Sequence, residues 1–121
     1  MIDLHNINPI LDKEFLIENY DSLEYLLEIF GDFLEIMPSE IDAIKASQIS
    51  NEREDMLKRI HSISSAVGFV GGLNLSERMR HFEADAKQNA DFDINSEEAN
   101  ILIDDIYEFI AIIQAEVEKF S

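Results

Sequence analysis

The longest amphipathic segment of the chain is residues 21–47, DSLEYLLEIFGDFLEIMPSEIDAIKAS. Its apolar residues recur at steps of three and four, which is the spacing of one face of an α-helix. They are Leu23, Leu26, Leu27, Phe30, Leu34, Met37, Ile41 and Ile44. Asp21 or Ser22 can cap the start of this helix, and Pro38 should bend it, because proline removes a backbone donor and crowds the preceding turn. A stripe of this length has to be buried against other elements, so it predicts a multi-helix core.

Three more amphipathic segments follow at the same helical spacing. Asn51 and Glu54 fit a capping box for the first of them, which ends at Gly71–Gly72. The stretch NADFDIN at 89–95 predicts a loop, and Ser96 then begins the last segment. The three stripes are Met56, Ile60, Ile63, Val67 and Val70; Leu75, Met79, Phe82 and Ala86; and Ala99, Leu102, Ile106, Phe109, Ile113, Val117 and Phe120.

Apolar residues near the start of the chain predict a short helix that covers one end of the core: Ile10, Leu11, Phe15 and Leu16. No alternating strand pattern and no internal repeat is present. Four amphipathic helices with short connections bury their stripes best against one another. The predicted fold is therefore all-α, an antiparallel four-helix bundle with a short N-terminal helix, in a single domain spanning residues 1–121.

The composition excludes several classes of protein. The chain has no cysteine, so it forms no disulfide and no thiolate metal site, which fits a reducing compartment. No apolar run approaches the ~18 residues of a membrane span, and the first ten residues lack a signal-peptide pattern, so we expect a cytoplasmic protein without a membrane partner. His5, in an N-terminus expected to fray, His61 and His81 have no helical i, i+3 or i+4 spacing to one another, so we expect no metal site.

The net charge of −17 is distributed unevenly. Residues 45–87 contain seven of the nine basic residues and six acidic ones, a net charge of +1, whereas the rest of the chain carries −18. A surface this acidic argues against nucleic acid as a partner, because it repels the phosphate backbone. The net charge of solvated helix faces also varies in sign where it serves no function. The alternative is that 45–87 presents the only non-repulsive face to an acidic partner.

His61 lies beside the apolar stripe of its helix but not on it. Each residue of a helix advances about 100°, so His61 follows Ile60 onto the flank of the stripe, where we expect the ring to be at least partly exposed. Ser64, Ser65 and Gly68 follow it within two turns, although other residues would favour the helix more. These small residues serve either close helix packing or the approach of a large partner to the ring.

The sequence around His61 resembles the signature of histidine-containing phosphotransfer (HPt) domains. The matching residues are His61-x-Ile63-x-x-Ala66-x-Gly68-x-Val70-Gly71, followed by Leu75 and Phe82-Glu83. The long segment LEYLLEIFGDFLEIMPSEIDAIKAS also resembles the second helix of that family, including its proline. The resemblance covers roughly residues 15–118.

The resemblance implies a phosphoryl carrier rather than an enzyme with its own turnover. His61 would take a phosphoryl group from an aspartyl phosphate on a receiver domain and pass it to another receiver, in response regulators or hybrid histidine kinases. Imidazole is a nucleophile at physiological pH, because its unperturbed pKa is about 6.5. The receiver would supply the acidic pocket and Mg²⁺, so the chain itself needs no cofactor. A closed bundle of this charge is expected to be a monomer.

Two positions depart from the family pattern. The family has a lysine at the position of Ser64 and a glycine at that of Ser65, and its lysine is thought to neutralise the phosphoryl group. Lys58, three residues before His61, is a candidate for part of that role, and Ser64 and Ser65 offer hydroxyl donors. We therefore expect Lys58, Ser64, Ser65 and Gly68 to stabilise the phosphoryl group or to contact the partner.

Two other functions stay open from the sequence. The first is a degenerate HPt-like module that binds receiver domains without carrying phosphate, which the loss of the lysine favours. The second is an acyl carrier, because Asp21-Ser22-Leu23 before an acidic helix resembles a phosphopantetheine attachment motif. That tripeptide lacks the usual preceding glycine and is explained by a helix N-cap.

Overall fold

The computed structural model describes residues 2–121, and this part of the chain is all-helical, with five helices and no strand. The helices are α1 (Lys13–Asn19), α2 (Leu23–Ile49), α3 (Arg53–Phe69), α4 (Leu73–Gln88) and α5 (Glu97–Phe120). The prediction of an all-α fold with a short N-terminal helix is confirmed. No helix over these residues is both long and apolar enough to cross a bilayer.

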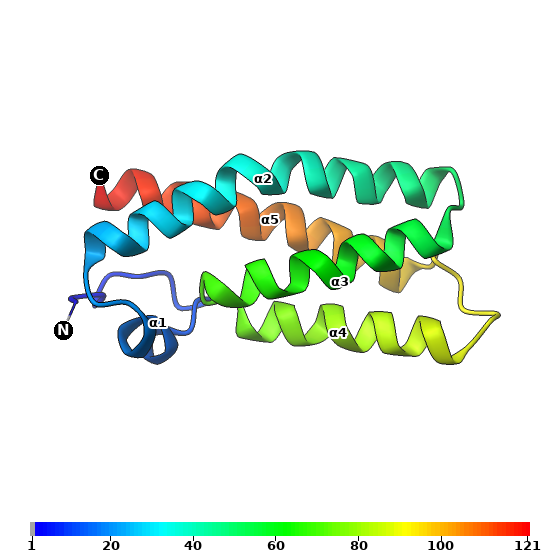
Figure 1. The fold of residues 1–121 in the computed structure, drawn as a ribbon, viewed down its shortest axis with the longest axis horizontal. Helices are drawn as coiled ribbons and strands as arrows, with labels where there is room; N and C mark the ends of the chain where they lie inside the picture. The colour runs from blue at the N-terminus through cyan, green and yellow to red at the C-terminus, as the bar shows by residue number, and fades with distance from the viewer. Residues whose placement is uncertain (1) are drawn as a thin grey trace.

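The four long helices α2–α5 lie side by side along the long axis of the molecule (Figure 1). α2 packs against α3 and α5, and α3 packs most extensively against α4. The short helix α1 lies at one end of the molecule, as predicted, and buries Leu16 completely (Figure 1). Ile10 and Leu11, which were predicted to belong to it, precede its first residue, and Ile10 is 56% exposed. Figure 1 also shows α2 changing direction part-way along, and Pro38 lies inside this helix.

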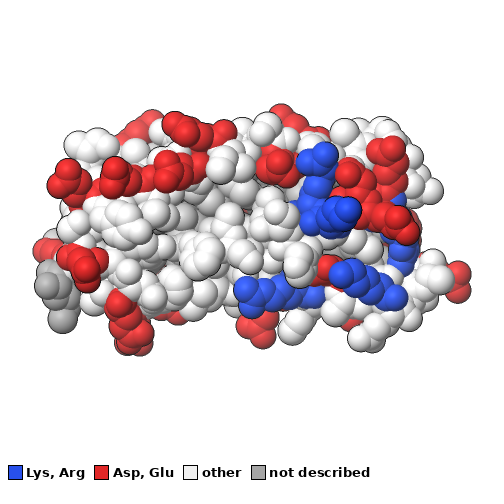
Figure 2. Space-filling view, viewed as in Figure 1, with Lys and Arg blue, Asp and Glu red and all other residues white. Residues whose placement is uncertain are grey.

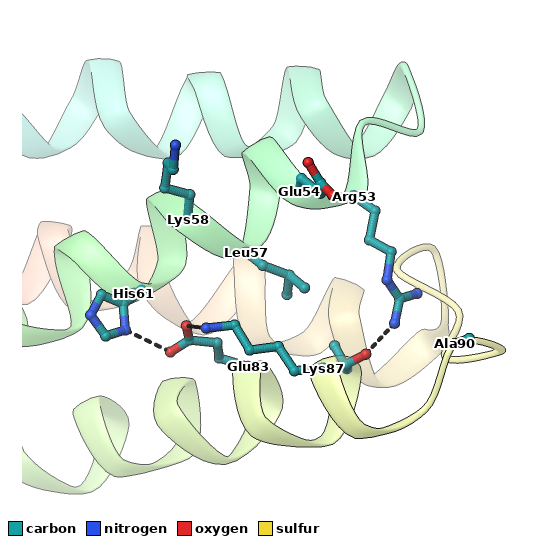
Figure 3. Close-up of a pocket in the computed structure, with 9 residues that line it drawn as sticks. Arg53, Glu54, Leu57, Lys58, His61, Glu83, Lys87 and Ala90 are labelled. Carbon is teal, nitrogen blue, oxygen red and sulfur yellow. Dashed lines mark hydrogen bonds and ion pairs between the residues drawn. The ribbon is translucent and has the colours of Figure 1, made fainter.

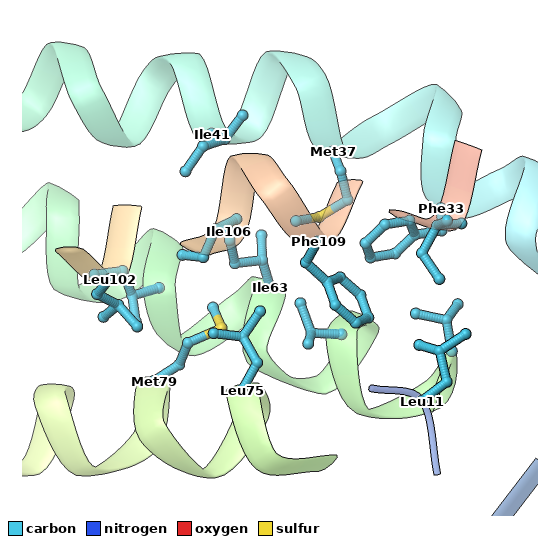
Figure 4. Close-up of a cluster of buried hydrophobic side chains, with 14 of the residues drawn as sticks. Leu11, Phe33, Met37, Ile41, Ile63, Leu75, Met79, Leu102, Ile106 and Phe109 are labelled. Atoms are coloured by element: carbon cyan, nitrogen blue, oxygen red, sulfur yellow. The ribbon is translucent and has the colours of Figure 1, made fainter. Parts of the chain in front are cut away.

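The predicted stripes meet in one core, in which side chains from α2, α3, α4 and α5 interdigitate (Figure 4). Phe30, Ile60 and Ile106 are fully buried. Leu34 and Val117 belong to the predicted stripes but are only half-buried, since they lie at the edge of the core. The spacing of apolar residues therefore identified the buried face of each long helix correctly.

The expectation of a frayed N-terminus is wrong. Leu4 is 1% exposed and Ile7 is 7% exposed, so this segment adds side chains to the core. Its backbone is held by α5: the Asn8 N–H donates to Glu116 Oε1 at 2.8 Å, and Lys119 donates to the carbonyl of Asn6. Single apolar residues in an irregular segment have no periodicity, which is why the sequence pattern did not reveal them.

The connection between α2 and α3 also differs from the prediction. Asn51 has a φ of +56° and terminates α2 in the left-handed conformation that asparagine tolerates better than most residues. α3 begins after Glu52, which makes no side-chain capping bond, so the predicted Asn51–Glu54 capping box is wrong. The caps at Ser22 and Ser96 are confirmed, since each accepts a backbone N–H three residues on.

The predicted loop between α4 and α5 is confirmed, and side chains from the end of α2 and the start of α3 hold it. The guanidinium of Arg53 donates to the carbonyls of Ala86, Asn89 and Phe92, which satisfies the C-terminal end of α4. The buried Gln48 donates to the carbonyl of Ile94 at 3.0 Å. The loop is thus fixed to the α2–α3 end of the molecule.

The turn between α3 and α4 requires glycine twice. Gly71 has a φ of +92°, a conformation that side-chain-bearing residues rarely adopt. At Gly72 a Cβ would lie 2.6 Å from Phe109 Cζ and 2.8 Å from Val67 Cγ1, so the backbone of this turn fits directly against α3 and α5.

We predict that Gly72→Ala lowers the free energy of unfolding by about 1–3 kcal/mol, because the new methyl group overpacks the core against Phe109. The matched control is Gly31→Ala within α2, where a Cβ would meet nothing within 4 Å. This change should raise the free energy of unfolding by about 0.5–1 kcal/mol through helix propensity. Urea denaturation followed by far-UV circular dichroism measures both; effects of the same sign would contradict the prediction.

Candidate functional site

His61 lies in the middle of α3 and its side chain is 71% exposed. Its neighbours Ile60 and Ile63 are buried, so the helix rotation that buries the stripe turns the imidazole outward on the side of α4. The predicted exposure of this ring is confirmed.

A carboxylate from α4 holds the ring. Glu83 Oε1 lies 2.9 Å from His61 Nδ1, and Glu83 Oε2 lies 2.6 Å from Nζ of Lys87, one turn further along α4 (Figure 3). The Glu83 side chain is only 9% exposed, whereas the His61 and Lys87 side chains are largely exposed. The three residues form a chain of contacts from the buried edge of α4 to the surface.

The charge state of Glu83 decides which ring nitrogen is reactive. Burial raises the pKa of Glu83, but the hydrogen bonds from Lys87 and His61 outweigh it and hold this pKa below its usual range. Glu83 is therefore ionised at neutral pH, and an ionised carboxylate only accepts hydrogen bonds. When the imidazole is neutral, Nδ1 must then carry the proton and Nε2 keeps its lone pair, on the side of the ring away from Glu83 (Figure 3).

A hollow of about 610 Å³ lies beside this pair, between α3 and α4. Leu57 and Ala86 supply apolar surface, His61 and Glu83 lie at one end, and Arg53 lies at the other. Figure 2 shows that lysine and arginine side chains gather on the part of this face over α3 and α4, while acidic side chains line α2. The uneven charge in the sequence thus corresponds to a surface around His61 that is less acidic than its surroundings.

The structure corrects two of the predicted site residues. Ser64 is 3% exposed, and its hydroxyl donates to the carbonyl of His61 at 2.8 Å, so it is not available to a group on the ring. Gly68 is also buried, and a Cβ there would lie 3.4 Å from Ser76 Oγ. The prediction of surface roles for Ser64 and Gly68 is wrong, because both positions face α4 and permit its close approach.

The other two predicted residues remain on the surface. Ser65 is exposed one helical turn after His61. Lys58 is exposed and lines the same hollow as His61, but its side chain points toward α2 and away from the ring (Figure 3). Of the predicted residues, the structure therefore leaves Ser65 beside the imidazole and does not bring Lys58 to it.

Exposed apolar side chains lie between α2 and α3, near the C-terminal end of α3. Phe69, eight residues after His61 on α3, is 61% exposed, and Ile36 of α2 is 58% exposed. Together with Ile29 and Ala66 they line a shallow hollow of about 180 Å³ between the two helices. The Tyr20 hydroxyl donates to the carbonyl of Phe69 at 2.6 Å and holds the end of α3. The position of Ile36 outside the predicted stripe of α2 was an available signal for this surface.

The remaining histidines lie elsewhere. Nδ1 of His5 is 2.8 Å from Asp3, and Nε2 of His81 is 3.9 Å from Glu77. Over residues 2–121 no group of three or more histidine, aspartate or glutamate side chains is arranged to hold a metal ion.

Comparisons of the chain with protein-family models, with curated proteins and with solved structures give no match.

We predict that Glu83→Gln flattens the acid dependence of stability. A carboxylate whose pKa is lowered on folding stabilises the folded state above its unfolded-state pKa, and this contribution is lost as the pH falls through the folded-state pKa. The difference in free energy of unfolding between wild type and Glu83→Gln should therefore shrink between about pH 5 and about pH 3. Glu77→Gln, at an exposed position of α4, is the matched control for the removal of one negative charge from this helix. A constant difference for Glu83→Gln across this range would contradict the prediction.

Proposed function

We propose that this protein is a histidine phosphotransfer protein that carries a phosphoryl group on Nε2 of His61 between receiver-domain aspartates. The observation that carries the proposal is the contact between His61 Nδ1 and the buried carboxylate of Glu83 at 2.9 Å. This contact orients an exposed ring and leaves the outer nitrogen free to act as a nucleophile.

The proposed transfer forms one bond to phosphorus and breaks another. The Nε2 lone pair attacks the phosphorus of an aspartyl phosphate, the bond from phosphorus to the aspartyl oxygen breaks, and the aspartate leaves as a carboxylate. The ring keeps its Nδ1 proton and gains positive charge, which the Glu83 carboxylate stabilises. The reverse sequence returns the group to another receiver. The Mg²⁺ that such a transfer uses belongs to the receiver in this proposal, and the chain is a carrier rather than an enzyme.

The proposal includes an architecture and a location. We interpret α2–α5 as an antiparallel four-helix bundle, because consecutive long helices are neighbours and two of their connections span only a few residues. We also expect a monomeric protein of the cytoplasm, where receiver domains are found.

The surface around His61 supports docking of a protein over the ring. Phe69 and Ile36 offer exposed apolar area on one side of His61, and the hollow beside Leu57 and Lys87 lies on the other. Apolar anchors beside complementary charge are typical of protein interfaces. An acidic receiver pocket would meet the least acidic part of this chain.

The central test is a transfer assay with phosphorylated receiver domains. The wild-type protein should take label from the receiver, and the bond should be labile in acid and stable in base, as expected for phosphohistidine. His61→Gln should take none, while its far-UV circular dichroism stays unchanged because the side chain is exposed. Label that persists in His61→Gln, or no label from any receiver tested, would contradict the proposal.

A degenerate module that binds receivers without carrying phosphate is the second candidate. The burial of Ser64, which leaves no cation at that position, favours it. The same assay separates the two functions, since the degenerate module would bind a receiver and yet take no label.

Docking through the apolar surface predicts that Phe69→Ala weakens receiver binding by about tenfold, because truncating an exposed aromatic anchor commonly costs more than 1 kcal/mol. The matched control is Ile101→Ala on α5, which removes a 49% exposed apolar side chain outside this surface. Titration calorimetry with a receiver measures both variants. Equal affinities for Phe69→Ala and wild type would show that the receiver does not contact this surface.

A further inference from the structure

The site needs a positive charge that its most obvious residues do not supply. A phosphoryl group on His61 carries up to two negative charges, and its transfer depends largely on positive groups placed at its oxygens. Ser64 is buried and uncharged, so α3 offers no cation at the position where HPt domains have lysine. The assignment of a residue that contacts the transferred phosphoryl group rests on the proposed function.

Three nearby cations are already engaged or directed elsewhere. Nζ of Lys87 is 2.6 Å from Glu83 and offsets that carboxylate. The guanidinium of Arg53 donates to backbone carbonyls at the end of α4. The Lys58 side chain points toward α2 (Figure 3).

Arg80 is different, because it is exposed and has no hydrogen bond or ion pair within residues 2–121. Its neighbour Arg78, by contrast, faces α5 and donates to Asp105 at 2.7 Å. Two arginines on one helix, two residues apart, therefore differ in orientation and in pairing.

The register of α4 against α3 turns the edge of α4 that carries Arg80 toward α3. Ser76 Oγ donates to the carbonyl of Ser64 at 2.7 Å, and Glu83 contacts His61 at 2.9 Å. Arg80 is four residues after Ser76 and three before Glu83, and residues at these spacings share one face of a helix. Arg80 thus lies between two contacts on the edge of α4 that faces α3.

The orientation of the His61 ring also favours a role for Arg80. Figure 3 shows Nε2 on the side of the imidazole away from Glu83. Arg80 precedes Glu83 by three residues, toward the N-terminal end of α4. A guanidinium presents several N–H donors in one plane and matches two phosphoryl oxygens at once. Figure 2 shows basic side chains along α4 on this face of the molecule.

We propose that Arg80 binds the phosphoryl group on Nε2 of His61 and supplies, from α4, the positive charge that residue 64 lacks. Glu83 and Arg80 then have separate tasks on the same helix edge. Glu83 orients the ring through Nδ1, and Arg80 meets the group that arrives at Nε2.

The test uses phosphoramidate, a small donor that removes the need for a receiver. The Nε2 lone pair attacks phosphorus, the P–N bond breaks, and ammonia leaves, so the reaction reports only on groups of this chain. We expect Arg80→Gln to slow the formation of phosphohistidine by about tenfold or more, because a charged donor to the phosphoryl oxygens is lost. Arg80→Lys should recover part of the rate.

Arg78→Gln is the matched control, since it removes the same charge two residues away on the side of α5. Its rate should stay within about twofold of wild type, because a charge displaced to another face is screened by solvent. A comparable loss in Arg78→Gln would mean a general effect of net charge and would overturn the proposal. A loss confined to Lys58→Gln would overturn it in favour of Lys58.

A second readout does not depend on the rate. In the phosphorylated protein, the ³¹P signal of the phosphoryl group should titrate at higher pH in Arg80→Gln than in wild type, because a nearby cation favours the dianion. An unchanged rate and titration in Arg80→Gln would overturn the role of Arg80 alone, with phosphate transfer intact. Failure of the wild-type protein to accept phosphate from phosphoramidate and from receivers would overturn both proposals.

Discussion

The close approach of α3 and α4 is the constraint on which the site depends. Small residues permit it: Gly68 packs on Ser76, and the Ser76 hydroxyl donates to the carbonyl of Ser64. At this separation a glutamate on α4 reaches the imidazole on α3 directly. A Cβ at position 68 would already lie 3.4 Å from Ser76 Oγ, so a side chain larger than alanine there would have to fit between the two helices. The packing of Gly68 and the position of His61 therefore both depend on the same close contact between α3 and α4.

The electrostatics of the site follow from how much of each group is buried. Glu83 is almost fully buried but stays ionised, because Lys87 and His61 both contact its carboxylate. His61 remains exposed on its outer side, so a protein partner can reach the same nitrogen that Glu83 leaves unprotonated. The remainder of the chain is strongly acidic. A partner with an acidic pocket is therefore repelled over most of the surface and least of all around the ring.

Sequence reasoning succeeded where a regular period carried the information. The stripes of α2, α3, α4 and α5 named the buried faces correctly, and the same helical geometry placed His61 on an exposed flank. It failed where a side chain's role depends on what lies opposite. Ser64 is only three residues from His61, yet its hydroxyl faces inward and is satisfied by a backbone carbonyl. The buried N-terminal residues Leu4 and Ile7 were missed because an irregular segment has no period to detect.

The sequence by itself determined that the chain is helical and which faces of the long helices are apolar. It also determined that His61 lies beside such a face and not on it. It did so because these features depend on neighbours three and four residues away. Only the tertiary structure decided that Glu83 contacts His61, and that Ser64 and Gly68 serve packing. The contact between Glu83 and His61 joins residues 22 apart in sequence, on two helices, and its geometry is set by how closely the helices pack and in what register.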